Sequence, residues 1–269
     1  MKSNLLNNFF ATIGRKTLKG LWEIDQYTRL VGQTLYWMAA APLKGHKIRF
    51  RSTIIQMVRF GVDSIPIVAT IAFFIGIILG MQAAYQLKPF GASIYMADLV
   101  GVSVTRELGP MLTAIVLAGR SGSAIAAELG TMKVSEEIDA LRTMGLNPIP
   151  YLAVPRVLSM MIMLPSLTLI ADFVGILGGL FVGIFSEHID FWLYFNETTR
   201  ALVLKDFLTG LIKSGVFALL VATIGCYQGF SVSGGAEGVG KRTTTSVVTS
   251  IFMIIAANVL FTGLFYSTL

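Results

Sequence analysis

The sequence predicts an all-α integral membrane protein in which five transmembrane helices follow an amphipathic or re-entrant N-terminal helical region. Composition is the first reason, because 54% of the 269 residues are hydrophobic, 13% are charged and the mean hydropathy is +0.73. An ordinary soluble domain has about 25% charged residues, so the charged shell of a soluble fold is missing. Intrinsic disorder is excluded as well, since it requires low hydrophobicity and high charge.

Five long stretches with few or no charges are the second reason. About 20 apolar residues in a helix cross a hydrocarbon core about 30 Å thick. Continuous apolar runs favour helices over the strands of a membrane barrel, in which apolar and polar residues alternate. Arg106 and Glu107 interrupt the second stretch, and Asp172 interrupts the third. The stretches are residues 64–87, 99–119, 157–186, 214–236 and 243–269.

The third stretch allows two interpretations. As one helix its 30 residues would be about 45 Å long and kinked at Pro165; otherwise it is a hairpin of two short helices. With five spans, 16 basic residues lie on one side of the membrane and three on the other. A hairpin would move Lys241 and Arg242 to the poorer side. The positive-inside rule therefore favours one long helix, a cytoplasmic N-terminus and a C-terminus outside.

The chain divides into an N-terminal region of cytoplasmic or interfacial helices, residues 1–62, and a five-span domain, residues 63–269. Leu6, Phe9 and Ile13 recur at helical spacing and basic residues follow them, which is typical of a helix lying in the membrane interface. Residues 30–41 are apolar but too few to span the membrane, and we expect them to be interfacial or re-entrant. Both segments could pad the bundle or dock a partner.

Arg106 and Glu107 are ionisable residues inside a predicted span. Such residues cost about 2.5–3.5 kcal/mol at the bilayer centre and normally face the protein interior or a water-filled cavity. Pro110 lacks an N–H for the carbonyl of Arg106, so we expect a helix kink at Gly109 and Pro110. Neighbours in a helix point about 100° apart, and each charge needs its own partner: a second protomer, a cavity or a lipid headgroup. A substrate path is favoured over a purely structural ion pair.

Residues 135–147 predict a short cytoplasmic helix. Ser135 suits the N-cap and Gly145 suits the stop. So short a helix is not stable alone in water, and it packs either on its own bundle or into another subunit. Acidic residues beside its apolar stripe favour the second possibility. The acidic first turn contains Glu136 and Glu137, and the stripe consists of Val134, Ile138 and Leu141.

Several kinds of chemistry find no support in the sequence. One cysteine and two histidines offer neither a disulfide framework nor a zinc site. Residues 235–241 match the spacing of a phosphate-binding loop up to its lysine, but Arg242 follows where a Ser or Thr should hold magnesium. We expect a flexible turn there, no metal, no cofactor bound by this chain, no catalytic residues and no nucleic-acid partner.

Three segments resemble one known family. RELGP at 106–110, AGRSGSAIAAELGTM at 118–132 and EEIDALRTMGLNP at 136–148 are similar to the MlaE (YrbE) permeases, the membrane subunits of ABC transporters that work with MCE-domain proteins. The resemblance implies a homodimer in the bacterial inner membrane, with its C-terminus in the periplasm. It implies cytoplasmic ATPase subunits that use ATP and Mg, a periplasmic MCE-domain protein and often a STAS-domain protein. The implied cargo is phospholipid or a related lipid, moved between inner and outer membranes to maintain outer-membrane lipid asymmetry.

The resemblance also implies roles for individual residues. Arg106 and Glu107, together with Gln82 and Tyr85, would line the substrate path. An alternative from another class is an ion-coupled secondary carrier that uses Glu107 or Asp172, although such carriers usually contain internal repeats and none is apparent. Coupling to the ATPase is assigned to Glu128, Glu136, Glu137, Ile138, Asp139, Leu141 and Arg142.

Overall fold

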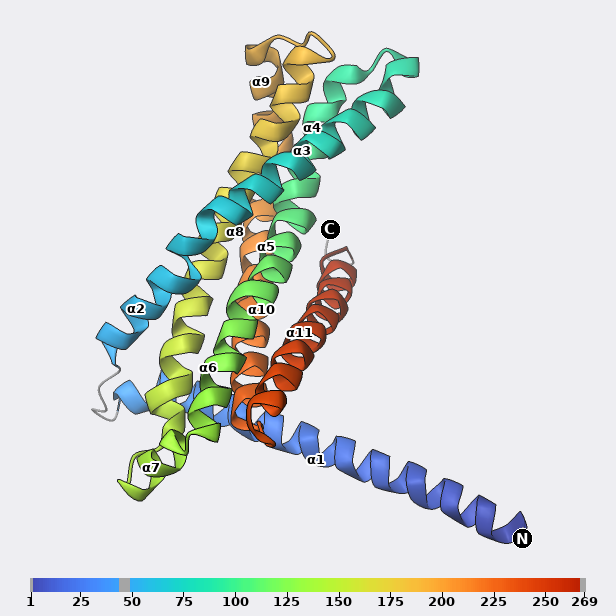
Figure 1. The fold of residues 1–269 in the computed structure, drawn as a ribbon. Helices are drawn as coiled ribbons and strands as arrows, with labels where there is room; N and C mark the ends of the chain where they lie inside the picture. Colours follow the sequence, from blue (N-terminus) through green and yellow to red (C-terminus); the bar gives the residue numbers. More distant parts are fainter. Residues whose placement is uncertain (1, 44–48, 267–269) are drawn as a thin grey trace.

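The computed structural model describes residues 2–43 and 49–266, and this part of the chain contains helices and no strand. Five of its helical segments are long and apolar enough to cross a membrane, which confirms the predicted fold class. They form one elongated bundle (Figure 1). The segments are Phe50–Phe90, Ser93–Val134, Ile149–Phe185, Leu204–Phe230 and Gly235–Phe265.

The N-terminal region begins with a single helix, α1 (Lys2–Leu43), instead of two separate elements. It crosses one end of the bundle and extends well beyond it (Figure 1). The Tyr27 hydroxyl lies 2.8 Å from the Thr223 hydroxyl, and Leu30 and Thr34 are buried. This half of α1 therefore packs on the bundle, whereas the side chains of the expected apolar face at residues 6–13 lie outside the described residues.

The first span combines α2 (Phe50–Phe60), a 3₁₀ turn (Val62–Ser64) and α3 (Ile65–Leu87). It therefore begins well before residue 64, where the uncharged stretch starts. The Ser159 hydroxyl donates to the carbonyl of Thr53 over 2.8 Å, which attaches α2 to the third span. A further 3₁₀ turn, Lys88–Phe90, ends the span.

The second span is a chain of helical pieces joined by π-helical turns. In order they are a 3₁₀ turn (Ser93–Tyr95), α4 (Met96–Ser103), a π-turn (Val104–Leu108), α5 (Gly109–Leu117), a π-turn (Ala118–Gly122) and α6 (Ser123–Val134). The short helix α7 (Glu137–Thr143) follows at the end of the bundle where α1 lies (Figure 1).

The third span settles the question of the hairpin. After a π-turn (Ile149–Ala153), α8 runs unbroken from Val154 to Phe185 with Pro165 inside it. It packs directly on α3, because a Cβ atom on Gly76 would lie 1.9 Å from the carbonyl oxygen of Gly175. Small residues let two helices approach this closely in lipid, so these glycines fix the contact between the first and third spans.

The chain returns through α9, α10 and α11. The short helix α9 (Phe191–Ala201), which sequence reasoning missed, is capped by the Asp190 carboxylate, which accepts from the Trp192 N–H over 2.9 Å. The fourth and fifth spans are α10 (Leu204–Phe230) and α11 (Gly235–Tyr266). The flexible turn expected at 234–243 is wrong: Gly234 and Gly235 adopt positive φ angles of 88° and 71°, and a helix starts at once. Arg242 lies on that helix and donates to Gln228 over 3.0 Å.

We predict that the ends of the bundle bearing α7 and α9 face opposite sides of the membrane, because α8 is one helix. Cysteines replacing exposed Lys241 and Asn196, each in a Cys226→Ala background, should differ in labelling by an impermeant thiol reagent in intact cells. The positive-inside rule makes Asn196→Cys the reactive one. Equal labelling of both positions would contradict the five-span arrangement.

Candidate functional site

The π-turn Val104–Leu108 places two charged side chains in the middle of the bundle. Because Pro110 has no N–H, the backbone widens here, and the Gly109 N–H bonds to the carbonyl of Val104. Neighbouring helices press on both sides of the turn. A Cβ on Gly109 would lie 1.8 Å from Asp172 Oδ1 of α8, and one on Gly210 of α10 would lie 2.4 Å from the Thr105 carbonyl oxygen.

Glu107 is the centre of a hydrogen-bonded cluster from three spans. The Lys213 ammonium donates to Glu107 Oε2 over 2.7 Å and to Thr262 Oγ1 over 3.0 Å. Thr262 Oγ1 lies 3.1 Å from both carboxylate oxygens, and Asn258 Nδ2 donates to Oε2 over 3.2 Å. The Lys213 side chain is 1% exposed and that of Glu107 is 29% exposed. The cluster thus joins α10 and α11 to the π-turn, with the carboxylate at its open side.

Arg106 points to a different partner on the same helix, α10. Its guanidinium lies 4.0 Å from Asp206 Oδ1, and the two side chains are 22% and 9% exposed. Asp206 and Lys213 are seven residues apart, about two helical turns, so they share one face of α10. The charges expected to need a second protomer, a cavity or a lipid headgroup have partners within the chain.

Sequence reasoning missed Asp206 and Lys213 as parts of this site. Lys213 directly precedes the uncharged stretch that begins at residue 214, so by its position it looks like a residue at the edge of a span. The sequence did contain a signal, because Asp206 and Lys213, two helical turns apart, carry the charges opposite to those of Arg106 and Glu107. Only the packing of α10 against the π-turn shows which charge meets which.

Gln82 and Tyr85 lie apart from the charged cluster. Gln82 lines a groove between α3 and α4 together with Leu99, Val100 and Ser103, and Tyr85 is 83% exposed. Within the described residues, neither side chain contacts Arg106 or Glu107 through a hydrogen bond or an ion pair. A substrate path lined by Gln82 and Tyr85 as well as by Arg106 and Glu107 would therefore need a further wall from outside this subunit.

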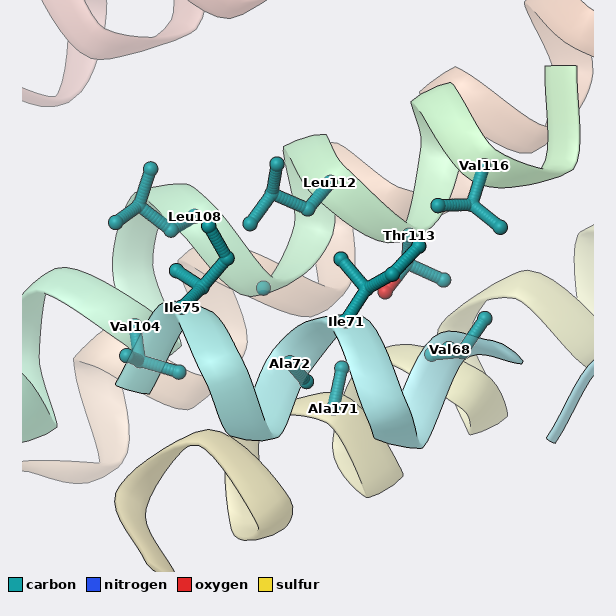
Figure 2. A pocket seen from close by; sticks show the side chains of 11 residues that line it. Val68, Ile71, Ala72, Ile75, Val104, Leu108, Leu112, Thr113, Val116 and Ala171 are labelled. Atoms are coloured by element: carbon teal, nitrogen blue, oxygen red, sulfur yellow. The ribbon is translucent and has the colours of Figure 1, made fainter. Parts of the chain in front are cut away.

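An apolar crevice lies between α3 and α5 and extends to the same π-turn (Figure 2). Ile71 and Ile75 of α3 face Leu108 and Leu112 across it, and Ala171 of α8 forms part of its floor. Val104 and Leu108, which flank the two charged residues, also line it. Charged and apolar surfaces therefore meet at one turn of the second span.

The helix α7 departs from its expected role in one respect. Ile138 is fully buried and Leu141 is 8% exposed, and both belong to the core of this chain. The bundle itself covers these two members of the predicted stripe, so they are not available to another subunit, whereas the third member, Val134, is 43% exposed. Ser135 is also not the N-cap: Glu136, with a φ angle of 59°, occupies that position.

The exposed surface of α7 lies at its C-terminal end. Gly145 has a φ angle of 75°; its N–H bonds to the Arg142 carbonyl and the Leu146 N–H to the Leu141 carbonyl, each over 3.0 Å. These two bonds form a Schellman motif, as the predicted stop at Gly145 requires. The motif leaves Met144 66% and Leu146 41% exposed. The charged residues Glu136, Glu137 and Arg142 are exposed as well.

Two further residues assigned to ATPase coupling already have partners within the chain. The Lys133 ammonium donates to Asp139 over 2.7 Å and thereby lowers the pKa of that carboxyl. Glu128 belongs to α6, where its carboxylate bridges Arg59 of α2 and Arg156 of α8, the latter over 3.1 Å. Glu128 thus ties three spans together, and its role in ATPase coupling stays a prediction.

Comparison with known proteins adds the decisive observation. The family model described as permease MlaE matches residues 53–264. The chain belongs to the MlaE permease family. It is an ABC transporter permease, the membrane-spanning component of such a transporter.

Relatives of this MlaE-family permease cover most of the chain. A probable ABC transporter permease protein of Rickettsia conorii is 37% identical over 97% of this chain and 99% of that protein. One from Synechocystis is 41% identical over 79% of this chain and 81% of that protein. The Arabidopsis thaliana protein named TRIGALACTOSYLDIACYLGLYCEROL 1, chloroplastic, is 37% identical over 83% of this chain and 64% of that protein.

We predict that Lys213 and Glu107 of the MlaE-family chain are strongly coupled. Lys213→Met should remove about 3–5 kcal/mol of stability, because it leaves a carboxylate without its cation inside the bundle. Adding Glu107→Gln, which removes the stranded charge, should recover part of that loss. Thermal unfolding of the single and double variants in detergent measures both effects. Strictly additive losses would show that the two side chains act independently.

Proposed function

We propose that this permease moves phospholipid, or a related lipid, between the inner and outer membranes of a bacterium. The observation that carries the proposal is the meeting of a charged turn and an apolar crevice in the second span of an MlaE-family chain. A phospholipid has the same two parts, a charged headgroup and apolar chains. The name of the Arabidopsis relative, which contains that of a galactolipid, also supports a lipid as cargo.

Arg106 is the residue we assign to the phosphate. A guanidinium presents paired N–H donors that match phosphate oxygens, and the Arg106 pair with Asp206 is long at 4.0 Å. A headgroup could compete for such a partner. Glu107 is held more tightly by Lys213, Thr262 and Asn258, so we assign it to fixing α10 and α11 around the turn.

ATP would be bound and hydrolysed, with Mg, by separate cytoplasmic subunits, and this chain would carry no ATPase site. Docking would use the exposed end of α7, Met144 and Leu146, with the charges of Glu136, Glu137 and Arg142 around them. Closure of the ATPase subunits would then move α7 and, through the core contacts of Ile138 and Leu141, the bundle. A ligand-driven change of shape needs such differential contact in the two states.

The proposed assembly contains a second copy of this chain. The support is α11, on which one apolar face is left open in the isolated subunit. A partner packed against α11 would enclose the Glu107 cluster, to which α11 contributes Asn258 and Thr262. The open face contains Val248, Phe252, Ile255 and Val259, exposed by 48–69%.

The remaining parts of the proposal concern location and other partners. We place the chain in the inner membrane, with the α7 end in the cytoplasm and the α9 end in the periplasm, because basic residues concentrate at the α7 end. A periplasmic MCE-domain protein would meet the α9 end, and a STAS-domain protein would act with the ATPase. The rival secondary carrier loses support because the chain belongs to a family of ABC permeases.

We predict that Met144→Asp uncouples the permease from its ATPase without unfolding it. Met144 is 66% exposed, so the change should alter stability by no more than about 0.5 kcal/mol. Burial of its side chain in a partner is worth about 1.5–3 kcal/mol, so ATPase recovered with the chain should fall about tenfold or more. Met144→Leu, which keeps an apolar side chain, is the matched control. Unchanged co-purification with Met144→Asp would refute docking at this surface.

We predict that lipid movement depends on the ATPase and on Arg106. The intact complex in proteoliposomes should transfer fluorescent phosphatidylglycerol to an acceptor only with ATP, and Arg106→Ala should reduce transfer while the ATPase subunits remain bound. Glu107→Gln should keep assembly but alter ATP turnover coupled to transfer. Transfer driven by an ion gradient in the absence of ATP would instead favour a secondary carrier.

A further inference from the structure

Asp172 is a buried acid in the middle of the bundle that has no partner in the described part of the chain. It lies on α8 and is 3% exposed, and its Oδ1 atom is buried without a hydrogen bond. It takes part in none of the ion pairs that the described residues form. Burial without a cation disfavours the ionised form of a carboxyl group.

The carboxyl group of Asp172 meets the backbone of the second span at Gly109. A Cβ atom on Gly109 would lie 1.8 Å from Asp172 Oδ1 and 3.0 Å from the carbonyl oxygen of Val104. Two oxygen atoms therefore converge on the same side of this glycine. A backbone carbonyl and an ionised carboxylate are both acceptors only, so they would repel each other unless a hydrogen atom or a cation lies between them.

The helices around Asp172 supply no cation for this place. The helices α3 and α5 contain no charged residue, and the charged residue of α4 is an acid, Asp98. The bases of the other neighbouring elements are paired in the π-turn and α10, exposed on α10, or 16 residues (about 24 Å) away along α8. In that order they are Arg106 and Lys213, Lys205, and Arg156.

Neighbouring hydroxyl groups do not supply the missing donor either. Thr113 lies one turn after Gly109 on α5, and its Oγ1 is buried without a partner of its own. Thr168 lies one turn before Asp172 on α8 and donates to the carbonyl of Leu164 over 2.9 Å. The hydrogen atom between the two oxygens therefore belongs to Asp172 itself.

We propose that Asp172 binds a proton as a neutral carboxylic acid and donates a hydrogen bond from Oδ1 to the carbonyl of Val104. That carbonyl already accepts from the Gly109 N–H, and its two lone pairs allow both bonds. The proton stays on Asp172 and is not transferred. Asp172 thereby attaches α8 to the first residue of the π-turn and acts as a positioning residue for Arg106 and Glu107. The proposal does not depend on the cargo or direction proposed above.

Infrared spectroscopy detects such a proton directly, because a neutral carboxylic acid has a C=O stretching band separate from those of carboxylates and amides. The full chain is measured at neutral pH in dodecyl maltoside, which has no ester carbonyl to cover this band. We expect the band in the wild-type chain and a shift when the chain is made with carboxyl-¹³C aspartate. Asp172→Asn should remove intensity from the band, whereas Glu107→Gln should leave it unchanged.

Hydrogen exchange measured by mass spectrometry tests the positioning role. Asp172→Leu is similar in size but has no donor, so the peptide that contains the Gly109 N–H should exchange about two- to tenfold faster, as the loss of one buried hydrogen bond implies. Asp172→Asn keeps a donor in its amide group and should exchange as the wild type does. The π-turn Ala118–Gly122 of the same span is the internal control. Thermal unfolding shows whether each variant is folded.

The opposite results would overturn the proposal. A wild-type spectrum without the band, or a band that Glu107→Gln removes and Asp172→Asn does not, would mean that Asp172 is ionised. A thermal midpoint that then rises with sodium chloride but not with choline chloride would assign the place of the proton to a sodium ion. Exchange that is unchanged in Asp172→Leu, or raised equally in Asp172→Asn, would refute the attachment of the turn. The infrared result needs only the isosteric variants, so it decides the proton even if Asp172→Leu does not fold.

Discussion

Pairing of charge inside the membrane is the constraint on which this structure depends. A lysine that is 1% exposed, Lys213, is tolerated because Glu107 and Thr262 accept its hydrogen bonds. An ionised group without such partners is expensive in a hydrocarbon environment. Since Glu107, Lys213 and Thr262 come from three different spans, satisfying the charge also fixes how those spans pack.

The irregular backbone of the second span serves the same pairing. A regular helix would direct Arg106 and Glu107 along fixed lines, whereas the π-turn before Gly109 re-aims both side chains toward α10. Glycines let neighbouring helices approach the turn: Gly109 leaves room for Asp172, and Gly210 leaves room for the Thr105 carbonyl. Charge pairing and close backbone packing are therefore one arrangement at this level of the bundle.

The two ends of the second span have different tasks. Near the α7 end, Glu128 braces α2 and α8 through two arginines, and Ile138 and Leu141 anchor α7 in the core. An anchored α7 suits a coupling element better than a loosely attached one, because a push on its exposed end is transmitted to the bundle. The apolar crevice lies between this end and the charged turn, so the surface proposed for the ATPase, on α7, follows in the chain directly after the span that carries the surface proposed for lipid.

The sequence by itself determined the class of the protein, the five spans and the unusual character of the second span. Hydrocarbon thickness and the cost of charge in lipid act on composition and length, which are readable without any fold. The stop of α7 at Gly145 was readable for a similar reason, since a left-handed residue ends a helix locally. Long apolar runs and the glycines at helix ends predict structure from nearby residues alone, without any tertiary contact.

Only the tertiary structure decided which groups meet. Lys213 and Asp206 look like residues at the edge of a span until α10 packs against the π-turn, and Ile138 and Leu141 look like a docking stripe until the bundle covers them. The start of α11 at Gly235 was hidden as well, because a glycine-rich and charged segment resembles a turn. A local pattern gives the chemistry that each residue offers, but the partner comes from contacts between helices far apart in sequence.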